Sequence, residues 1–237
     1  MDAAAVDPQL RAIYRVGGNA AVLLGLSYLV ITGLYVAAGQ VPNDGQGISY
    51  LEYLEGKQGI WWGITGLSVL TDLLFLPVAA ALYLALRASG NVLAFLGSVL
   101  LALFAVLDMA VTWTNYAALI ELTGNLAGVE DVRLRIAIIG AASYPAALLD
   151  SSLFAAYVIL IPGLGVGALG LVMTRSGFSQ AGGYIGIFTG VLAIAAVVGP
   201  IFAESWSVLA IPTAVLTTVW VLIVGYRLIR LSSARGS

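Results

Sequence analysis

The sequence predicts an all-α, polytopic membrane protein: a bundle of six transmembrane helices with one additional short interfacial helix. Of the 237 residues, 61% are hydrophobic and only 9% are charged, a balance that soluble domains do not have. The apolar runs are long and continuous rather than alternating, which favours helices over strands. No polar stretch is long enough to form a soluble domain, so residues 1–237 are expected to form a single transmembrane domain.

Six spans are predicted from the long apolar runs. The first run follows Arg11 and Arg15 and lacks a small-residue cleavage site, so it is interpreted as a retained helix. Tight turns are expected at 88–91 and 175–182. The apolar stretch 134–174 is too long for one span and short for two, so it is divided into a short helix and a full span. The predicted spans cover about 18–39, 59–87, 92–119, 149–174, 183–202 and 206–231, and the short helix covers about 132–147.

The distribution of basic residues supports six spans. With a cytoplasmic N-terminus, the inside loops and tails contain seven arginines, whereas the outside contains three basic residues. This asymmetry follows the positive-inside rule. The alternative is a fold of seven spans, in which the helix over 132–147 also crosses the membrane, but it would place four of the arginines outside. The inside set is Arg11, Arg15, Arg87, Arg175, Arg227, Arg230 and Arg235; the outside set is Lys57, Arg133 and Arg135.

The composition excludes several kinds of chemistry. The chain has no cysteine and no histidine, which removes disulfides, thiol nucleophiles, haem ligation, the usual zinc sites and Ser-His or Cys-His catalysis. The net charge of −2 comes without a basic block, so nucleic acid is not an expected partner. We therefore expect no cofactor and no metal, and we expect the partners to be the lipid bilayer and a lipophilic small molecule.

Two aspartates, Asp72 and Asp108, each fall near the middle of a predicted span. An acidic side chain at bilayer depth costs roughly 2.5–3.5 kcal/mol on insertion scales, and neither apolar run contains a lysine or arginine that could neutralise its acid from within the same helix. An intramembrane acid of this kind is by default a functional candidate. Both residues are therefore predicted to be catalytic, with a structural pair that shares a proton as the alternative.

Polar and aromatic side chains share helix faces with these acids, at the i, i+4 and i+7 spacings of an α-helix. They lie in the outer half of the predicted bundle or near its midplane, and the inner halves are nearly free of polar groups. We therefore expect an outward-facing cavity above a plug of packed apolar side chains. The residues predicted to bind substrate there are Trp61, Thr65, Ser68, Thr112, Trp113, Asn115, Tyr116 and Tyr28, with Asp150 and Glu204 at the rim.

These residues also have structural interpretations. Threonine and serine in membrane helices commonly form hydrogen bonds between helices, and tryptophans near helix ends belong to the interfacial aromatic belt. Asp150 and Glu204 can be solvated or capping groups.

Three functions fit the pattern. The first is an enzyme that acts on a lipophilic, isoprenoid-like substrate by acid catalysis, because a buried carboxyl without a basic partner is expected to keep its proton near neutral pH. Aromatic faces could then stabilise a carbocation during cyclisation. The alternatives are a proton- or cation-coupled small transporter and a non-catalytic protein that binds lipid or assists assembly.

Two resemblances add expectations. In size, span number and paired acids, the chain resembles the integral-membrane terpene cyclases, which implies a lyase or isomerase. From Gly167 to Gly190, the Ser176-Gly177 turn between two Gly-rich spans resembles a family of small bacterial six-helix membrane proteins of unknown function. That family tends to carry a proline soon after Ser-Gly, where this chain has Ser179-Gln180. The resemblance implies a multi-pass protein of the bacterial inner (plasma) membrane, with both termini in the cytoplasm.

Overall fold

A computed structural model describes residues 8–233, with the backbone alone for Pro8, Gln9 and Glu204. Helices form nearly all of this part of the chain, and it contains no strand. The elements are α1 (Pro8–Ala38), α2 (Gly47–Leu54), α3 (Gln58–Leu107), η1 (Asp108–Trp113), α4 (Thr114–Leu126), α5 (Val132–Leu149), α6 (Ser152–Ala155), η2 (Ala156–Leu160), α7 (Ile161–Arg175), α8 (Gln180–Val198), η3 (Gly199–Ile201), η4 (Glu204–Leu209) and α9 (Ala210–Ser233).

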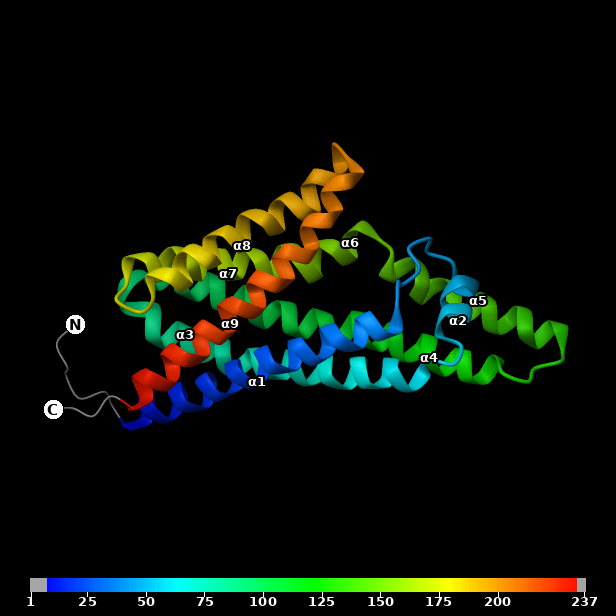
Figure 1. Ribbon diagram of the computed structural model, residues 1–237, viewed down its shortest axis with the longest axis horizontal. Coiled ribbons are helices and arrows are strands. Elements are labelled where there is room, and N and C mark those ends of the chain that lie inside the picture. Colours follow the sequence, from blue (N-terminus) through cyan, green and yellow to red (C-terminus); the bar gives the residue numbers. More distant parts are fainter. Residues whose placement is uncertain (1–7, 234–237) are drawn as a thin grey trace.

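The predicted helical membrane bundle is confirmed. Six helices in the described part are long and apolar enough to span a membrane: Leu10–Ala38, Gln58–Leu126, Val132–Leu149, Ser152–Arg175, Gln180–Ile201 and Ser205–Ser233. The second of these reverses direction at Gly90, where the backbone leaves helical geometry, so it forms two antiparallel legs. We call them the first leg (58–89) and the second leg (91–126). Figure 1 shows an elongated bundle in which α1 begins and α9 ends at the same end.

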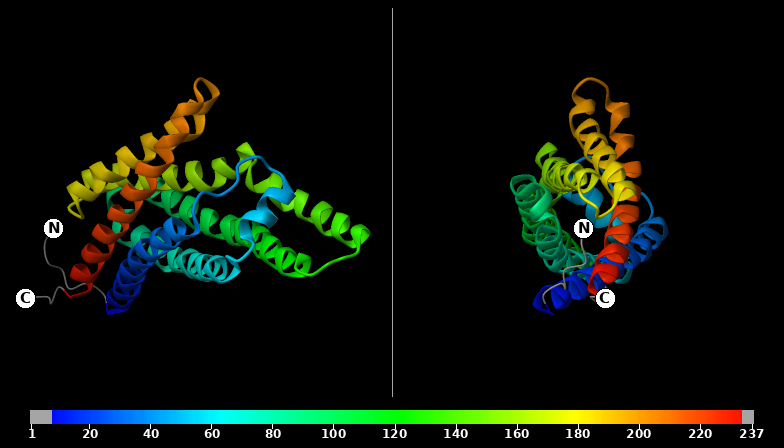
Figure 2. Two further views of the ribbon diagram at one scale, coloured as in Figure 1. Left: turned by 45° about the vertical axis from the view of Figure 1, so that its right-hand side comes forward. Right: turned by 90° about the vertical axis from the view of Figure 1, so that its left-hand side faces the viewer.

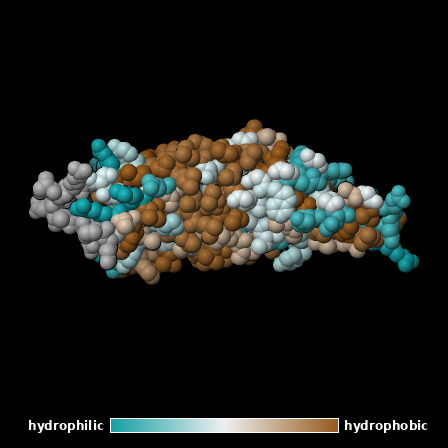
Figure 3. Space-filling view, turned by 90° about the horizontal axis from the view of Figure 1, so that it is seen from below, coloured by the Kyte–Doolittle hydropathy of each residue, from teal (hydrophilic) through white to brown (hydrophobic). Residues whose placement is uncertain are grey.

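The half of the bundle that was predicted to be nearly free of polar groups is closely packed with apolar side chains. Phe75 of the first leg and Phe104 of the second leg are buried, and their rings meet edge to face at 5.5 Å between centroids. Leu82, Leu86 and Leu101 are fully buried in the same core. This core fills the half of the bundle nearer the chain termini, and Figure 3 shows a wide apolar band on one face of the bundle.

A second core lies at the opposite end of the bundle, where α2 and α5 pack with the end of the second leg. We call these three elements the terminal layer. Tyr50, Leu51 and Leu54 of α2 are buried in it. A methyl group on Gly47 would come within 2.7 Å of backbone atoms of Ala142 and Ser143, so α2 and α5 touch directly. The predicted short helix is therefore α5, and it belongs to the terminal layer rather than to the main core.

The loop before α2 is held by local polar contacts. The Ser49 hydroxyl donates to Asp44 Oδ2 at 2.6 Å, and the Gln46 N–H donates to Asp44 Oδ1 at 3.0 Å. These hydrogen bonds favour the carboxylate and lower the pKa of Asp44. After α2, the Lys57 ammonium donates to the carbonyl of Ala38 at 3.0 Å, which ties the start of α3 to the end of α1.

Helices α7 and α8 cross with almost no side chains between them. Gly170 of α7 faces backbone atoms of Gly183, Gly186 and Ile187 of α8, all within 3.0 Å of where a methyl group on Gly170 would lie. Such small-residue contacts are typical of membrane helix pairs, because close backbone approach increases van der Waals contact. The connection at 199–209 projects away from the other helices (Figure 2).

Two helix ends differ from the prediction. Helix α1 covers Pro8–Ala38, so it already includes the ten residues before the predicted start at 18, and Arg15 in this extension is exposed. The second leg continues to Leu126 instead of residue 119. It does so because Leu119, Ile120 and Thr123 are buried in the terminal layer. Hydropathy marks only the apolar part of a helix, so both extensions were missed.

Candidate functional site

The structure brings Asp72 and Asp108 together through one indole. Trp113 Nε1–H lies 3.0 Å from Asp72 Oδ2 and 3.2 Å from Asp108 Oδ2, so a single donor is shared by both carboxyls. The two acids are 1% and 5% exposed. No lysine or arginine of the described residues binds either carboxyl. We call Asp72 and Asp108 the acid pair, and Trp113 supplies the indole that they share.

The local backbone explains how one helix supplies two of these three groups. Residues Asp108–Trp113 form a π-helical segment. In an α-helix, with 3.6 residues per turn, residues five apart point to different sides of the helix. The wider π turn, with its i to i+5 hydrogen bond, brings such residues onto one side. This widening lets the Trp113 indole reach the Asp108 carboxyl of its own helix while it also bonds Asp72 of the first leg.

Several buried polar atoms near the acid pair have no hydrogen-bond partner among the described residues. One is Asp108 Oδ1, the oxygen that does not bond the indole. Two others, Trp61 Nε1 and Thr65 Oγ1, lie on the predicted stripe of the first leg. Unpaired buried polar groups are costly, and in native proteins they mark places where water, a ligand or catalysis is involved. Ser68, on the same stripe, is buried, and its carbonyl accepts a hydrogen bond from the Thr71 hydroxyl at 2.7 Å.

Aromatic rings occupy much of the region where an outward-facing cavity was predicted. Tyr116 stacks on Trp61 at 4.6 Å and on Trp113 at 5.7 Å between ring centroids. Tyr35 and Tyr53 meet Trp61 edge to face at 5.7 and 5.9 Å. Trp61 is fully buried, so it is not the interfacial belt residue that its position suggested. The stack links the terminal layer to the acid pair.

Two predicted substrate-binding residues contact other groups, and the two predicted rim residues show no place in a site within the described part of the chain. The Asn115 amide donates to the carbonyl of Val111 in its own helix at 2.6 Å. Tyr28 packs against Phe75, with ring centroids 6.4 Å apart. Asp150 is exposed at the end of α5, and the side chain of Glu204, at the start of η4, lies outside the described residues.

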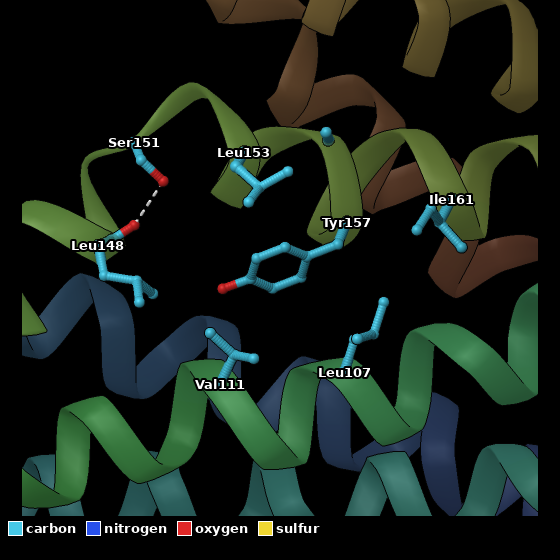
Figure 4. Close-up of a pocket in the computed structure, with 8 residues that line it drawn as sticks. Leu107, Val111, Leu148, Ser151, Leu153, Tyr157 and Ile161 are labelled. Atoms are coloured by element: carbon cyan, nitrogen blue, oxygen red, sulfur yellow. Dashed lines mark hydrogen bonds between the residues drawn. The ribbon is translucent and has the colours of Figure 1, made fainter.

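A cavity lies between the second leg and α6–η2, beside the stretch of the second leg that carries Asp108. It measures about 360 Å³ and its walls are almost entirely apolar. Figure 4 shows the ring of Tyr157 reaching across it toward the helix that carries Leu107 and Val111. The lining residues are Leu107, Val111, Leu148, Ser151, Leu153, Ala156, Tyr157 and Ile161.

Tyr157 connects this cavity with the helix that carries Asp108. Its hydroxyl accepts from the Thr112 hydroxyl at 3.5 Å, and Thr112 follows Asp108 by four residues in the second leg. Tyr157 belongs to η2, a second π-helical segment that faces η1 across the cavity. Tyr157 was not predicted from the sequence, although it is the only tyrosine in the predicted span 149–174. The described residues contain no group of three or more histidine, cysteine or acidic side chains that could hold a metal ion.

We expect the Trp113→Phe substitution to destabilise the fold by about 1–3 kcal/mol, because two buried carboxyls lose the donor that they share. In a chain of this size the loss corresponds to a fall of several degrees in the unfolding midpoint. Thermal unfolding of the purified protein in detergent measures it. Trp62→Phe is the matched control, because Trp62 is 43% exposed on the same leg as Asp72. Equal midpoints for the two variants would contradict the shared hydrogen bond.

Comparison with known proteins gives no match to this chain: no family model, no curated protein and no solved structure is similar to it.

Proposed function

We propose that the protein is a membrane-embedded enzyme that acts on a lipophilic, isoprenoid-like substrate by acid catalysis, as in a protonation-initiated cyclisation. The observation that carries this proposal is the pair of buried carboxyls that share one N–H and have no basic partner among the described residues. Two negative charges on carboxyls that share one donor in a low-dielectric bundle would repel each other, and we therefore assign one proton to the pair. A carboxyl that is kept neutral in this way is a general acid.

Each member of the site has a role in the proposal. Asp108 donates the proton, since its Oδ1 is free of other hydrogen bonds among the described residues. Asp72 is the second carboxyl that keeps the pair partly protonated, and Trp113 positions both. With a terminal epoxide as substrate, the proton goes to the epoxide oxygen and a C–O bond breaks. An alkene electron pair then forms a C–C bond, and a C–H proton returns to the Asp108 carboxylate, so the product is an isomer of the substrate.

Proton-coupled transport is the alternative use of an intramembrane acid pair. It requires a path from the pair toward both sides of the membrane. In the half of the bundle nearer the termini, that path is occupied by Phe75, Phe104 and Leu101, which are buried in close contact. The packing therefore favours chemistry at a closed site over passage through the bundle.

We place the termini in the cytoplasm of a bacterium, with the terminal layer on the outside of the inner membrane. Support comes from the distribution of basic residues between the two ends of the bundle. Helix α1 begins and α9 ends at one end (Figure 1), where the turns at Gly90 and 176–179 also lie. The elements that begin, end or turn there contain Arg11, Arg15, Arg87, Arg175, Arg227 and Arg230, whereas the opposite end contains Lys57, Arg133 and Arg135. This distribution follows the positive-inside rule.

The proposal is tested with purified protein in lipid nanodiscs and a linear C15 isoprenoid alcohol that carries a terminal epoxide. The expected result is a product of unchanged mass and altered chromatographic retention, formed by the natural sequence. The double variant Asp72→Asn/Asp108→Asn, checked for an unchanged elution profile, should form none. Equal conversion by the double variant would exclude acid catalysis by the pair. Flux of a solute in proteoliposomes that collapses with the pH gradient would favour transport instead.

A further inference from the structure

The cavity between η1 and η2 opens at the apolar surface of the bundle, and its walls include Leu107 and Val111 of the helix that carries Asp108. Leu153 at its rim is 70% exposed, whereas Tyr157 at its inner wall is 6% exposed. The cavity thus extends from the lipid-facing surface to a buried hydroxyl. Its volume of about 360 Å³ lies within the range of small-molecule sites in proteins. π-Helical segments, which form parts of two facing walls, are frequent at functional sites.

We propose that this cavity is the substrate site, and that it takes a single linear apolar chain from the bilayer whose terminal oxygen binds the Tyr157 hydroxyl. This inference adds a binding site to the proposed function. It rests on that function only for the reaction that the bound substrate undergoes. The binding itself stands on the geometry of the cavity alone.

The lining defines the chemical class of the ligand. None of the described residues that line the cavity is charged, so phosphorylated and ionic head groups meet no counter-charge among them. The Ser151 hydroxyl is already engaged, because it donates to the carbonyl of Leu148 at 2.7 Å and accepts from the N–H of Phe154 at 3.3 Å. The Tyr157 hydroxyl has only its long contact with Thr112 among the described residues. It can therefore donate to one neutral oxygen, such as that of an alcohol, an epoxide or a ketone.

The same contacts give the proton a path to the substrate. Thr112 follows Asp108 by four residues in the second leg, and its hydroxyl donates to the Tyr157 hydroxyl at 3.5 Å. In this path, Asp108 gives a proton to the Thr112 oxygen, Thr112 gives its own proton to the Tyr157 oxygen, and Tyr157 gives its proton to the substrate oxygen. Each hydroxyl gains one proton and loses one, and Asp108 is left as the carboxylate. Thr112 and Tyr157 thus relay the proton that the acid pair stores.

Photolabelling tests the site. The probe is a C15 isoprenoid alcohol that bears a diazirine, added to the protein in nanodiscs and mapped by mass spectrometry. Labels are expected on peptides that contain 107–111 or 148–161. The cavity-filling variants Ala156→Phe and Val111→Phe, made on opposite walls, should each lower labelling about tenfold or more. Val106→Phe is the matched control, because Val106 is 51% exposed on the second leg and does not line the cavity.

Competition identifies the ligand class. Farnesol and pentadecanol should displace the probe better than the hydrocarbon pentadecane, and Tyr157→Phe should reduce this preference about threefold to tenfold. Displacement by pentadecanol alone would support the site and overturn the isoprenoid substrate of the proposed function. Unchanged labelling in both cavity-filling variants would overturn the site, whatever the turnover. Labelling as expected in a protein without isomerase activity would keep the site and reject the function.

Discussion

The Gly170→Val substitution is expected to lower the stability of the bundle by about 3 kcal/mol. A β-carbon at this position would lie 2.7 Å from the carbonyl oxygen of Gly183 and 2.7 Å from the backbone nitrogen of Ile187. Both obstacles are backbone atoms of α8, which cannot rotate away as a side chain can. The valine must therefore separate α7 from α8, and the lost contact area is large because the two helices cross here without intervening side chains.

Thermal unfolding in detergent measures the effect, with an expected fall of about 6–12 °C in the midpoint. Gly66→Val is the matched control, because Gly66 lies in a membrane helix and no described atom of another part of the fold is within 4 Å of where its β-carbon would lie. Its midpoint should stay the same or rise slightly, since valine is the better helix former. Equal behaviour of the two variants would show that the backbones of α7 and α8 do not meet at Gly170.

Much of the fold follows from the sequence for a simple physical reason. Backbone polar groups in a bilayer must be satisfied within their own segment, so each long apolar run has to be a helix. The tight turn at 88–91 and the separate helix over 132–147 follow from the same runs and the breaks between them. The terminal layer is less predictable, because the residues that extend the second leg to Leu126 mix polar with apolar side chains and include Glu121. They are helical because Leu119 and Ile120 find partners in α2 and α5, which is a tertiary effect.

The acid pair was predictable as a pair of residues, but its arrangement was not. Asp72 and Asp108 stand out because each is an unneutralised charge within an apolar run. The role of Trp113 was missed because helix faces were assigned at 3.6 residues per turn, and η1 departs from that spacing. The same limit applies to Tyr157, whose approach to Thr112 depends on a second π segment. No local pattern in the sequence marks either segment.

The Asp108→Asn substitution should lower turnover of the epoxide probe by about 10²- to 10⁴-fold, the range that one general acid contributes. Asparagine has the size of aspartate, and its side-chain oxygen can still accept from Trp113, so the fold and the photolabelling of the cavity should be unchanged. The loss then reflects the missing proton rather than a missing site. Asp131→Asn is the control, because Asp131 caps α5 in the terminal layer and asparagine caps helices equally well.

The Asp72→Asn substitution tests whether the two acids have different roles. Its carboxyl is bound to the same indole but has no described contact with the Thr112–Tyr157 path, so this substitution should slow turnover less than Asp108→Asn. A general acid works only while it is protonated, so the turnover that remains in Asp72→Asn should increase as the pH is lowered. A pH–rate profile of both variants measures this. Equal losses of turnover in the two variants, without pH dependence, would mean that the two acids only stabilise the fold and that another group supplies the proton.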